Sequence, residues 1–596
     1  MHYLFVMPRF IQEPGQMYWF PLGIAYVSAS LKQVCSTVTC LNLNVHTRPL
    51  EEEITDYIDR YEIDVIAIGG LSTYFNQIKQ VIEIAKAHKP AVITMLGGGI
   101  LTATPEVLMR AIPQLDIGMI AEGEITIQEL DQCFHNHRKL EDVKGIIYRD
   151  GSGAIHRTPQ RADIMELDQL PFPDYDGFEF DGRGEINICT SRSCPFNCTF
   201  CFHTCGQKYR ARSMDSIFSE IDWLVKRYHI SKLGILDELF STNIPRVAEF
   251  CDRIKPYGLH WGCQMRVDKL TLEILEKMKD SGCTEISYGI ESADNRVLES
   301  MKKHTTIQQV ERALALTRQA KMSPFGNLLL GDPADDLESF QKNYDWYQAH
   351  PDIQLGFITI LVLPGSALYA TAVKRGLIKD EVKYLEEGKY RINLTALTDE
   401  QYLACLKKME AVTALREYPL ENVKVTGYDD QERKYIAEGT CPLCKEKITA
   451  FTDDFLGKKR FPCYHCGRPY TFNLYSCFNR RLDRIVQERW KGKNVLLWGL
   501  NEEGYKFAAQ CEFMRGEDVF IADRNARSTK AGKIRGKEIQ LPGDVFQRHD
   551  IDLVLLGMSV PPTQDAIRNE IRTRYSRSVE IKNANEYLLS VSRELV

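Results

Sequence analysis

The chain has 596 residues, of which 44% are hydrophobic and 26% charged, as in an ordinary soluble globular protein and unlike disordered or collagen-like chains. At roughly 150 residues per domain, this length predicts about four domains. The net charge of -6 gives no sign of a nucleic-acid partner. Charged residues interrupt every apolar stretch before the ~18 residues of a membrane span, and the N-terminus lacks an export signal. We therefore expect a cytoplasmic protein with no membrane partner.

Cysteine spacing predicts two metal sites. The chain has 18 cysteines, and a reducing compartment disfavours disulfides between them. Isolated cysteines are typically small core residues, but seven of the 18 fall into two closely spaced sets. The sets are Cys194, Cys198 and Cys201, and then Cys441, Cys444, Cys463 and Cys466.

Residues 1–150 alternate short apolar runs with helical patterns. Near-continuous apolar strands between helices predict an α/β domain with a doubly wound parallel sheet. Ligands of such sheets bind outside the carboxyl ends of the strands, where glycines allow close approach. The candidate ligand-binding residues at these ends are Leu71, Ser72, Thr73, Gly97, Gly98, Glu122 and Gly123.

The middle of the chain predicts a second β/α domain. Residues 151–180 are rich in Gly, Pro and Asp and are typical of a linker. Over 181–390, about six strand-helix units predict a partial or full β/α barrel, with its active site at the carboxyl ends of the strands. Residues 391–440 are charged and predict a helical segment.

Residues 441–480 predict a zinc ribbon. Cys441 and Cys444 form one CxxC pair, Cys463 and Cys466 form another, and 18 residues separate the pairs. This spacing lies within the range of four-cysteine zinc sites. Four thiolates leave no open position, so the metal is expected to be structural. Redox-active dithiols are the main alternative.

Residues 481–596 return to strand-helix alternation and predict a Rossmann-like domain. A loop from Gly499 to Gly504 follows one strand, and Asp523 ends the next. The loop reads GxxxxG rather than GxGxxG. The sequence leaves open whether this domain binds a nucleotide or sugar nucleotide or serves as a docking or packing module.

The first cysteine set has the pattern CxxxCxxC and follows the apolar run INICTS. Three thiolates can bind three irons of a [4Fe-4S] cluster, which leaves the fourth iron open to a substrate or cofactor. The alternative is a zinc knuckle or three buried cysteines, although zinc sites usually have four ligands.

The segment CPFNCTFC (194–201) resembles the cluster loop of radical S-adenosylmethionine (SAM) enzymes. LDELF (236–240), QMRVD (264–268), YGIES (288–292), GNLLLG (326–331) and LPGSALY (363–369) resemble that family's later motifs in order and spacing. The resemblance implies a [4Fe-4S] cluster whose open iron binds SAM, and cleavage of SAM to a 5′-deoxyadenosyl radical. It implies SAM-binding roles for Asp237, Glu238, Arg266 and Glu291.

Several residues in and around the cluster loop allow more than one interpretation of their role. Cys205 is either a spare thiol, a fourth ligand in a resting state or a catalytic group. A polar supporting role is the simplest interpretation of His203. Ion-paired structural roles are the alternative for Asp237 and Arg266.

The N-terminal domain resembles the cobalamin-binding domain that precedes many radical SAM domains. FPLGIAYV (20–27), GGLST (69–73), GGG (97–99) and AEGE (121–124) carry the resemblance. The DxHxxG motif is absent and His46 lacks its spacing, so the resemblance implies cobalamin bound without a histidine ligand. A degenerate domain without a cofactor is the alternative.

Together these resemblances imply a cobalamin-dependent radical SAM methyltransferase acting on an unactivated carbon of a small molecule or sugar-type metabolite. They imply an electron donor such as a flavodoxin or ferredoxin. One alternative keeps the cofactors but catalyses a rearrangement or oxidation. An RNA-modifying methylthiotransferase is disfavoured, because the N-terminal domain lacks a suitable cysteine trio. The non-enzymatic alternative is a metal-bound scaffold, which requires that the cluster loop bind zinc instead of an iron–sulfur cluster.

Overall fold

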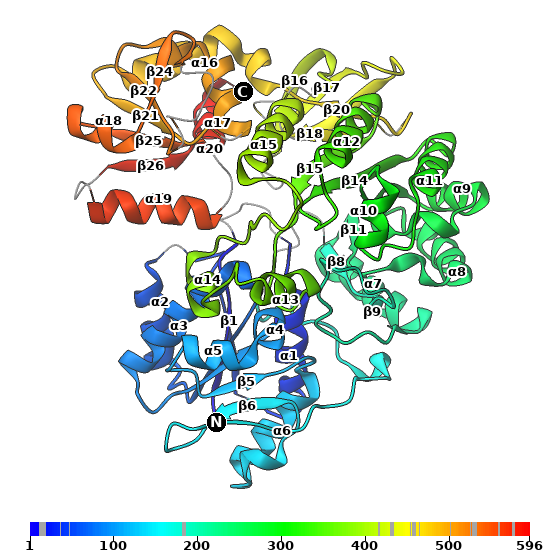
Figure 1. Cartoon of the computed structure of the whole chain (residues 1–596), viewed down its shortest axis with the longest axis vertical. Helices are drawn as coiled ribbons and strands as arrows, with labels where there is room; N and C mark the ends of the chain where they lie inside the picture. The colour runs from blue at the N-terminus through cyan, green and yellow to red at the C-terminus, as the bar shows by residue number, and fades with distance from the viewer. Residues whose placement is uncertain are drawn as a thin grey trace. The chain divides into compact units, whose positions relative to one another are not determined.

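The computed structural model describes all residues except 11–18, 36, 47, 181–185, 415–417, 430–433, 453–454, 456–459, 464, 501, 525, 527–532, 558–560, 575–578 and 596. Its contacts divide the chain into two compact units (Figure 1). The first comprises Met1–His350 and Leu355–Ala404, and the second Pro351–Gln354 and Cys405–Val596. The finer boundaries at 150, 180, 390, 440 and 480 stay predictions, and residue 181 lies outside the described residues.

The N-terminal sheet of the first unit has seven strands in the order β2-β1-β3-β4-β5-β6-β7. The predicted parallel pairing is confirmed for β1 to β5, whereas β6 and β7 add an antiparallel edge. The order 2-1-3-4-5 reverses direction beside β1, which is where such sheets bind ligands. The strands are β1 (Tyr3–Met7), β2 (Val38–Asn42), β3 (Val65–Gly69), β4 (Ile93–Gly97), β5 (Ile117–Met119), β6 (Ile146–Arg149) and β7 (Ile155–Arg157).

Among the described residues of 1–150, six helices accompany this sheet. Helix α3 is an amphipathic example, and its buried side consists of Phe75, Ile78, Val81, Ile82 and Ala85. The helices are α1 (Leu22–Lys32), α2 (Leu50–Arg60), α3 (Phe75–His88), α4 (Gly99–Ala103), α5 (Pro105–Ala111) and α6 (Glu124–His135).

The second sheet of the first unit has six strands in the order β15-β14-β13-β12-β11-β8, and the pairs from β14 to β8 are parallel. Among the described residues its outer strands β8 and β15 do not pair with each other, so the sheet is an open partial barrel rather than a closed one. The predicted strand at INICTS is β8, and its preceding residue Glu185 lies outside the described part. The strands are β8 (Ile186–Ile188), β11 (Lys232–Ile235), β12 (His260–Met265), β13 (Cys283–Glu291), β14 (Ser323–Leu330) and β15 (Gln354–Thr359).

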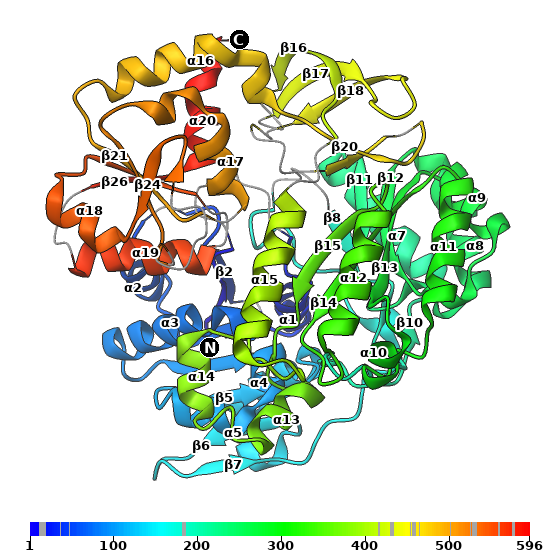
Figure 2. The same ribbon diagram turned by 45° about the horizontal axis from the view of Figure 1, so that its top comes forward.

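Helices connect these strands, and α8, α9 and α11 lie side by side (Figure 2). Side-chain oxygens cap several of their N-termini, as Ser213 does for α7 and Thr306 for α11. The helices are α7 (Met214–Tyr228), α8 (Ile244–Ile254), α9 (Leu272–Asp280), α10 (Asn295–Ser300), α11 (Ile307–Gln319) and α12 (Leu337–Ala349).

The chain then returns from the second sheet to the first. Helix α13 (Ala367–Lys374) precedes α14 (Glu381–Glu387), which packs on α3 and α5. Leu385 and Tyr390, 0% and 5% exposed, belong to the same hydrophobic core as the strands of the N-terminal sheet. The segment that follows the second sheet therefore completes the core of the first.

The helical prediction for 391–440 is only partly correct. Helix α15 (Asp399–Ala414) is present, but β16 (Glu421–Asp429) and β17 (Lys434–Thr440) form an antiparallel pair that β18 (Lys447–Thr452) extends. Exposed and half-buried residues alternate along β16. That period of two is the signature of a strand rather than a helix, and the charged composition concealed it.

The C-terminal sheet of the second unit has the order β23-β24-β22-β21-β25-β26 and is parallel except between β23 and β24. Among the helices of the described residues, none combines the length and apolar character needed to cross a membrane. The elements are α16 (Leu474–Trp490), β21 (Val495–Trp498), α17 (Glu502–Gln510), β22 (Val519–Ala522), β23 (Lys533–Ile534), β24 (Lys537–Gln540), α18 (Pro542–Arg548), β25 (Leu553–Leu556), α19 (Pro561–Arg574), β26 (Glu580–Asn583) and α20 (Ala584–Ser592).

Candidate active site

The three cysteines of the CxxxCxxC pattern lie on one loop beyond β8. A short antiparallel pair, β9 (Ser191–Arg192) and β10 (Arg210–Ala211), closes the base of this loop. Cys194 and Cys198 are half-buried and Cys201 is exposed. The loop therefore presents its thiols from a fixed base at the carboxyl end of the second sheet.

Cations beside the loop lower the pKa of its thiols, although burial raises the pKa of Cys194. The Cys201 thiol donates to Cys198 and lowers the pKa of Cys198 to about 6, with further lowering from the positive charges of Lys303 and Arg266. The same hydrogen bond, with burial, raises the pKa of Cys201. Thiolates are the form in which cysteine binds metal, so the two cations favour binding of iron at this loop.

Arg266 joins the cluster loop to the turn after α10. Its guanidinium lies 3.7 Å from the centroid of the Phe196 ring. It also donates to the carbonyl oxygens of Lys303 (3.1 Å) and His304 (3.2 Å). The predicted SAM contact of Arg266 stays a prediction, and the structure shows a cation–π and hydrogen-bonded support for the loop.

Glu291 and Lys303 form a buried ion pair next to the thiols. Lys303 Nζ lies 2.7 Å from Glu291 Oε1. Burial lowers the pKa of Lys303, but the charges of Glu291 and Cys198 raise it above its usual value. Gly289 leaves the space for this pair, because a Cβ there would lie 2.2 Å from Lys303 Nζ. Sequence reasoning identified Glu291 but missed Lys303, which no motif marks.

Asp237 supports the strand end before the loop. Its carboxylate accepts from Thr190 N (2.6 Å), Thr190 Oγ1 (2.6 Å), Ser191 N (3.0 Å) and Ser191 Oγ (2.6 Å). An ionised carboxylate offers about four lone-pair positions, so these donors use its accepting capacity. Burial raises the pKa of Asp237 despite the four donors. Its predicted contact with SAM stays a prediction.

Glu238 and His203 form a second pair beside the loop. Glu238 Oε2 lies 2.6 Å from His203 Nδ1, and His203 Nε2 lies 2.9 Å from the Phe196 carbonyl oxygen. Because both partners accept, both ring nitrogens must donate, which requires the imidazolium form. The hydrogen bond to Glu238 accordingly raises the pKa of His203. The polar supporting role of His203 fits this geometry.

The ends of β3 and β4 are rich in glycine and lie close together. We call residues Gly69–Leu71 and Gly97–Gly99 the glycine cradle. Gly98 has φ +83°, and a Cβ there would lie 2.9 Å from Gly70 N. A Cβ at Gly99 would lie 3.0 Å from Thr204 Cγ2 and 3.1 Å from Leu71 Cδ2. Thr204 comes three residues after Cys201, so the cluster loop lies directly against this cradle.

The other residues predicted at these strand ends surround the cradle. Leu71 is 57% exposed, and Ser72 and Thr73 lie in the 3₁₀ turn before α3. Tyr390 donates to the Ser72 carbonyl oxygen at 2.5 Å. Gly97 ends β4 and Gly123 precedes α6. The structure thus brings these predicted residues to one edge of the sheet.

Two predicted or considered ligands have other partners. Glu122 is buried, and its two carboxylate oxygens bind Arg192 and Arg210; a cofactor contact for it stays a prediction. His46 lies 3.5 Å from Glu53 and 3.3 Å from Glu179. Both histidine nitrogens therefore face carboxylates, as expected if this histidine does not bind cobalt.

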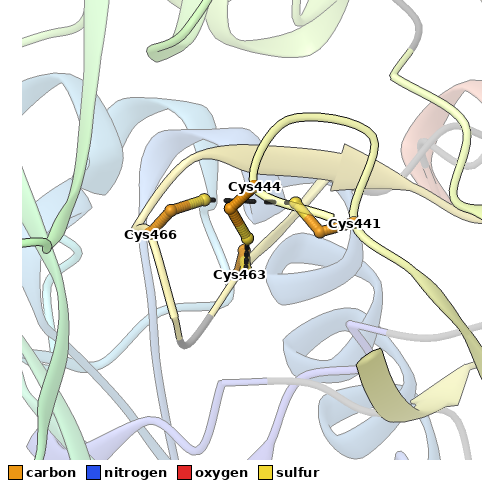
Figure 3. A group of neighbouring side chains, drawn as sticks. All are labelled: Cys441, Cys444, Cys463 and Cys466. Atoms are coloured by element: carbon orange, nitrogen blue, oxygen red, sulfur yellow. Dashed lines mark hydrogen bonds between the residues drawn. The ribbon is translucent and has the colours of Figure 1, made fainter. Parts of the chain in front are cut away.

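The second cysteine set forms a compact group in the second unit. The sulfur atoms of Cys441, Cys444, Cys463 and Cys466 all lie within 4.8 Å of one another (Figure 3). Each CxxC pair turns back on itself: Lys445 N donates to the Cys441 carbonyl and Gly467 N to the Cys463 carbonyl. This is the only such group of metal-binding side chains among the described residues.

The C-terminal glycine loop is engaged within its own domain. Leu500 N donates to Asp523 Oδ2 at 2.9 Å. A Cβ at Gly504 would lie 2.0 Å from the Gly499 carbonyl oxygen, so these glycines permit tight packing between helix and strands. Asn501 of the loop lies outside the described residues.

Two domain families match the chain in the order in which the sheets occur. The B12 binding domain matches residues 13–131 and the radical SAM superfamily matches residues 188–347. The chain belongs to the cobalamin-dependent radical SAM family. The cluster loop and the glycine cradle fall within these two matches.

Three curated relatives are similar to this chain. An uncharacterized methyltransferase of Pyrococcus horikoshii is 29% identical over 60% of this chain and 79% of its own. Cytidylyl-2-hydroxyethylphosphonate methyltransferase of Streptomyces wedmorensis is 24% identical over 65% and 84%. The anaerobic magnesium-protoporphyrin IX monomethyl ester cyclase of Rubrivivax gelatinosus is 26% identical over 59% and 67%.

Solved structures share the fold. The radical SAM methyltransferase TsrM of Kitasatospora setae, with tryptophan and a SAM analogue bound, has a TM-score of 0.55 at 16% identity, covering 63% of this chain and 76% of its own. The cobalamin-dependent radical enzyme OxsB, with aqua-cobalamin and SAM bound, has a TM-score of 0.51 at 18% identity, covering 82% and 67%.

Proposed function

We propose that this radical SAM enzyme is a cobalamin-dependent methyltransferase that methylates an unactivated carbon of a small molecule or sugar-type metabolite. The observation that carries the proposal is the contact of the cluster loop with the glycine cradle, through Thr204, Gly99 and Leu71. A methyl carrier bound at the cradle would lie next to a radical formed at the loop. Such proximity contributes about 7–11 kcal/mol to a transfer step.

The residues present fit both cofactors. Cys194, Cys198 and Cys201 supply three thiolates from one loop, which suits a [4Fe-4S] cluster with an open iron. A Cβ at Gly98 would meet the Gly70 backbone at 2.9 Å, so glycines keep these strand ends as bare backbone, which a bulky ligand can approach closely. When bound, these groups supply an electron for SAM cleavage and a carrier for the methyl group.

The chain's own residues hold the reacting groups and balance their charge. Lys303 and Arg266 offset the negative charge of the thiolates. Asp237 fixes Thr190 and Ser191 before the loop, and the imidazolium of His203 ties the Phe196 carbonyl to Glu238. Electrons for the reaction would come from a flavodoxin or ferredoxin.

The four-cysteine group fits a structural zinc ion. Two CxxC turns present four sulfur atoms within 4.8 Å, and Cys441 and Cys463 belong to the hydrophobic core of that region. Four thiolates complete a tetrahedron and leave no position for a substrate. The metal is therefore assigned to stability rather than to the reaction.

The test uses the anaerobically reconstituted protein with cobalamin, a reductant and SAM carrying a deuterated methyl group. Incubation with metabolites from cells lacking the gene should yield 5′-deoxyadenosine and a metabolite bearing the labelled methyl. Replacing all three loop cysteines with alanine should abolish both products, and a Cys477→Ala variant should retain them. Failure of the wild-type protein to retain cobalamin would refute the proposal.

A second candidate function is a radical rearrangement or oxidation with the same cofactors. The match to an anaerobic ester cyclase specifically favours it. It predicts a changed metabolite that lacks the labelled methyl. No finding favours an RNA methylthiotransferase, because residues 13–131 match the B12 binding domain.

A further inference from the structure

A buried carboxylate connects the N-terminal sheet to the base of the cluster loop. Glu122 follows β5, and its side chain is 4% exposed. Its Oε1 accepts from Arg192 at 2.7 Å and its Oε2 from Arg210 at 2.7 Å. Oε2 also accepts from Ile164 N at 2.8 Å. One side chain from the cobalamin-binding domain thus holds both strands that close the base of the cluster loop.

Arg210 extends this connection to both ends of the loop. It donates to the Cys205 carbonyl oxygen at 2.6 Å and to Ser193 Oγ at 3.3 Å. Ser193 Oγ donates to the same Cys205 carbonyl at 2.8 Å. Ser193 has φ +70° and directly precedes Cys194, so the guanidinium holds a strained backbone position beside the first thiol.

Arg192 forms the second connection. It binds Glu124 Oε1 at 2.6 Å as well as Glu122, and its guanidinium lies 5.1 Å from the centroid of the Tyr26 ring. Glu124 and Tyr26 both belong to the cobalamin-binding domain. Two arginines on the radical SAM side therefore face two glutamates on the other, in a site where all four side chains are at most 10% exposed.

We propose that Glu122 is a positioning residue, which sets the distance between the cluster loop and the cobalamin cradle through Arg192 and Arg210. The inference rests on the proposed function and adds a role that no cofactor contact explains. Each carboxylate oxygen binds a different arginine, so the spacing depends on both oxygens accepting. An amide can accept with only one of its two atoms.

The spacing matters because transfer steps depend steeply on distance. A misplacement of about 1 Å can reduce a rate by roughly 10²-fold. Cleavage of SAM at the cluster depends on the loop itself, whereas methyl transfer also depends on where the cobalamin cradle lies. A positioning role therefore predicts that changes at Glu122 separate the two rates, while a role in general stability would lower both together.

The experiment compares wild type, Glu122→Gln and Glu129→Gln, each reconstituted with cluster and cobalamin. Glu129 is the control because it lies on α6, the helix that follows Glu122, but pairs with Arg161 rather than with the loop. The first readout is the magnetic coupling between the reduced cluster and cob(II)alamin in pulsed electron paramagnetic resonance, which reports the distance between them. The second is the rate of methyl transfer from SAM to cobalamin divided by the rate of 5′-deoxyadenosine formation.

Glu122→Gln should weaken or broaden the coupling and lower the rate ratio by up to about 10²-fold, while Glu129→Gln should match wild type. If Glu122→Gln does not fold, Glu122→Asp keeps the charge but cannot span both arginines and should show the same changes. The inference would be overturned if the folded variant showed the wild-type magnetic coupling per bound cluster and the wild-type ratio of the two rates. Loss of cobalamin binding by wild type would instead overturn the proposed function.

Discussion

Asp237 offers the sharpest test of the site, because sequence resemblance and structure assign it different roles. The resemblance implies a contact with SAM, whereas the structure shows four hydrogen bonds from Thr190 and Ser191. The two backbone N–H groups share Oδ1 and the two hydroxyls share Oδ2. An asparagine can therefore keep its oxygen toward the N–H groups and donate its amide hydrogens to the hydroxyl oxygens.

The structural role predicts a large difference between two substitutions. Asp237→Asn should change the free energy of unfolding by no more than about 1 kcal/mol, because every partner keeps a hydrogen bond. Asp237→Ala leaves two buried N–H groups without an acceptor. At about 1–3 kcal/mol each, this variant should lose about 2–6 kcal/mol, with loss of the cluster as the strand end loosens.

The assay combines urea unfolding, iron content and SAM binding to the reconstituted protein, with Asp252→Asn, a surface carboxylate paired with Lys277, as the control. If Asp237 instead held the SAM ammonium, Asp237→Asn would lose a charge-assisted bond of about 1.5–3 kcal/mol. SAM binding would then weaken roughly 10- to 100-fold. That loss in a variant of normal stability and iron content would refute the structural assignment.

Three further predictions address other parts of the chain. Gly98→Ala should lower cobalamin retention, because an alanine with this left-handed backbone costs about 1–2 kcal/mol and its Cβ would meet Gly70. The control Gly376→Ala also has a positive φ of +70°, but its Cβ would lie in open space, so it should retain cobalamin. Equal cobalamin retention in the spectra of the two variants would contradict the role of the cradle. Cys463→Ser should lower zinc content and the stability of the second unit but leave iron unchanged by elemental analysis, with Cys477→Ser as control; parallel loss of iron would argue against a separate zinc site. Burial raises the pKa of Asp335 to about 6, so the folded state binds this proton more tightly than the unfolded state does. The resulting contribution to the free energy of unfolding is fully present below about pH 4 and is lost as pH rises through about 6. Asp335→Asn should remove this slope in urea unfolding and be about 3 kcal/mol more stable than wild type near pH 7, and an unchanged slope would count against the assignment.

The parts of the fold set by local patterns could be predicted from the sequence. Continuous apolar runs predicted the strands of both parallel sheets, and cysteine spacing predicted which thiols share the ribbon-like group. Strand-end position brought Leu71, Gly97 and Gly98 together, because parallel strands end at one edge.

What the sequence concealed depends on contacts between distant residues. Lys303, Arg192 and Arg210 lie in no motif, and only the packing of separate elements places them beside Glu291 and Glu122. Glu122 was predicted from its place at a strand end and Asp237 from a family motif, but neither signal shows which partners a carboxylate has. The strands β16 and β17 were missed because charged residues obscured their alternation.

The return of the chain from the second sheet to the first has a consequence for engineering. Leu385 and Tyr390 complete the hydrophobic core of the N-terminal sheet although they follow the barrel strands in sequence. A cobalamin-binding fragment cut near residue 150 would expose an apolar hollow where these two side chains belong. Chimaeras between relatives should therefore exchange the segment around 381–390 together with the N-terminal domain, since the two have to be matched in shape.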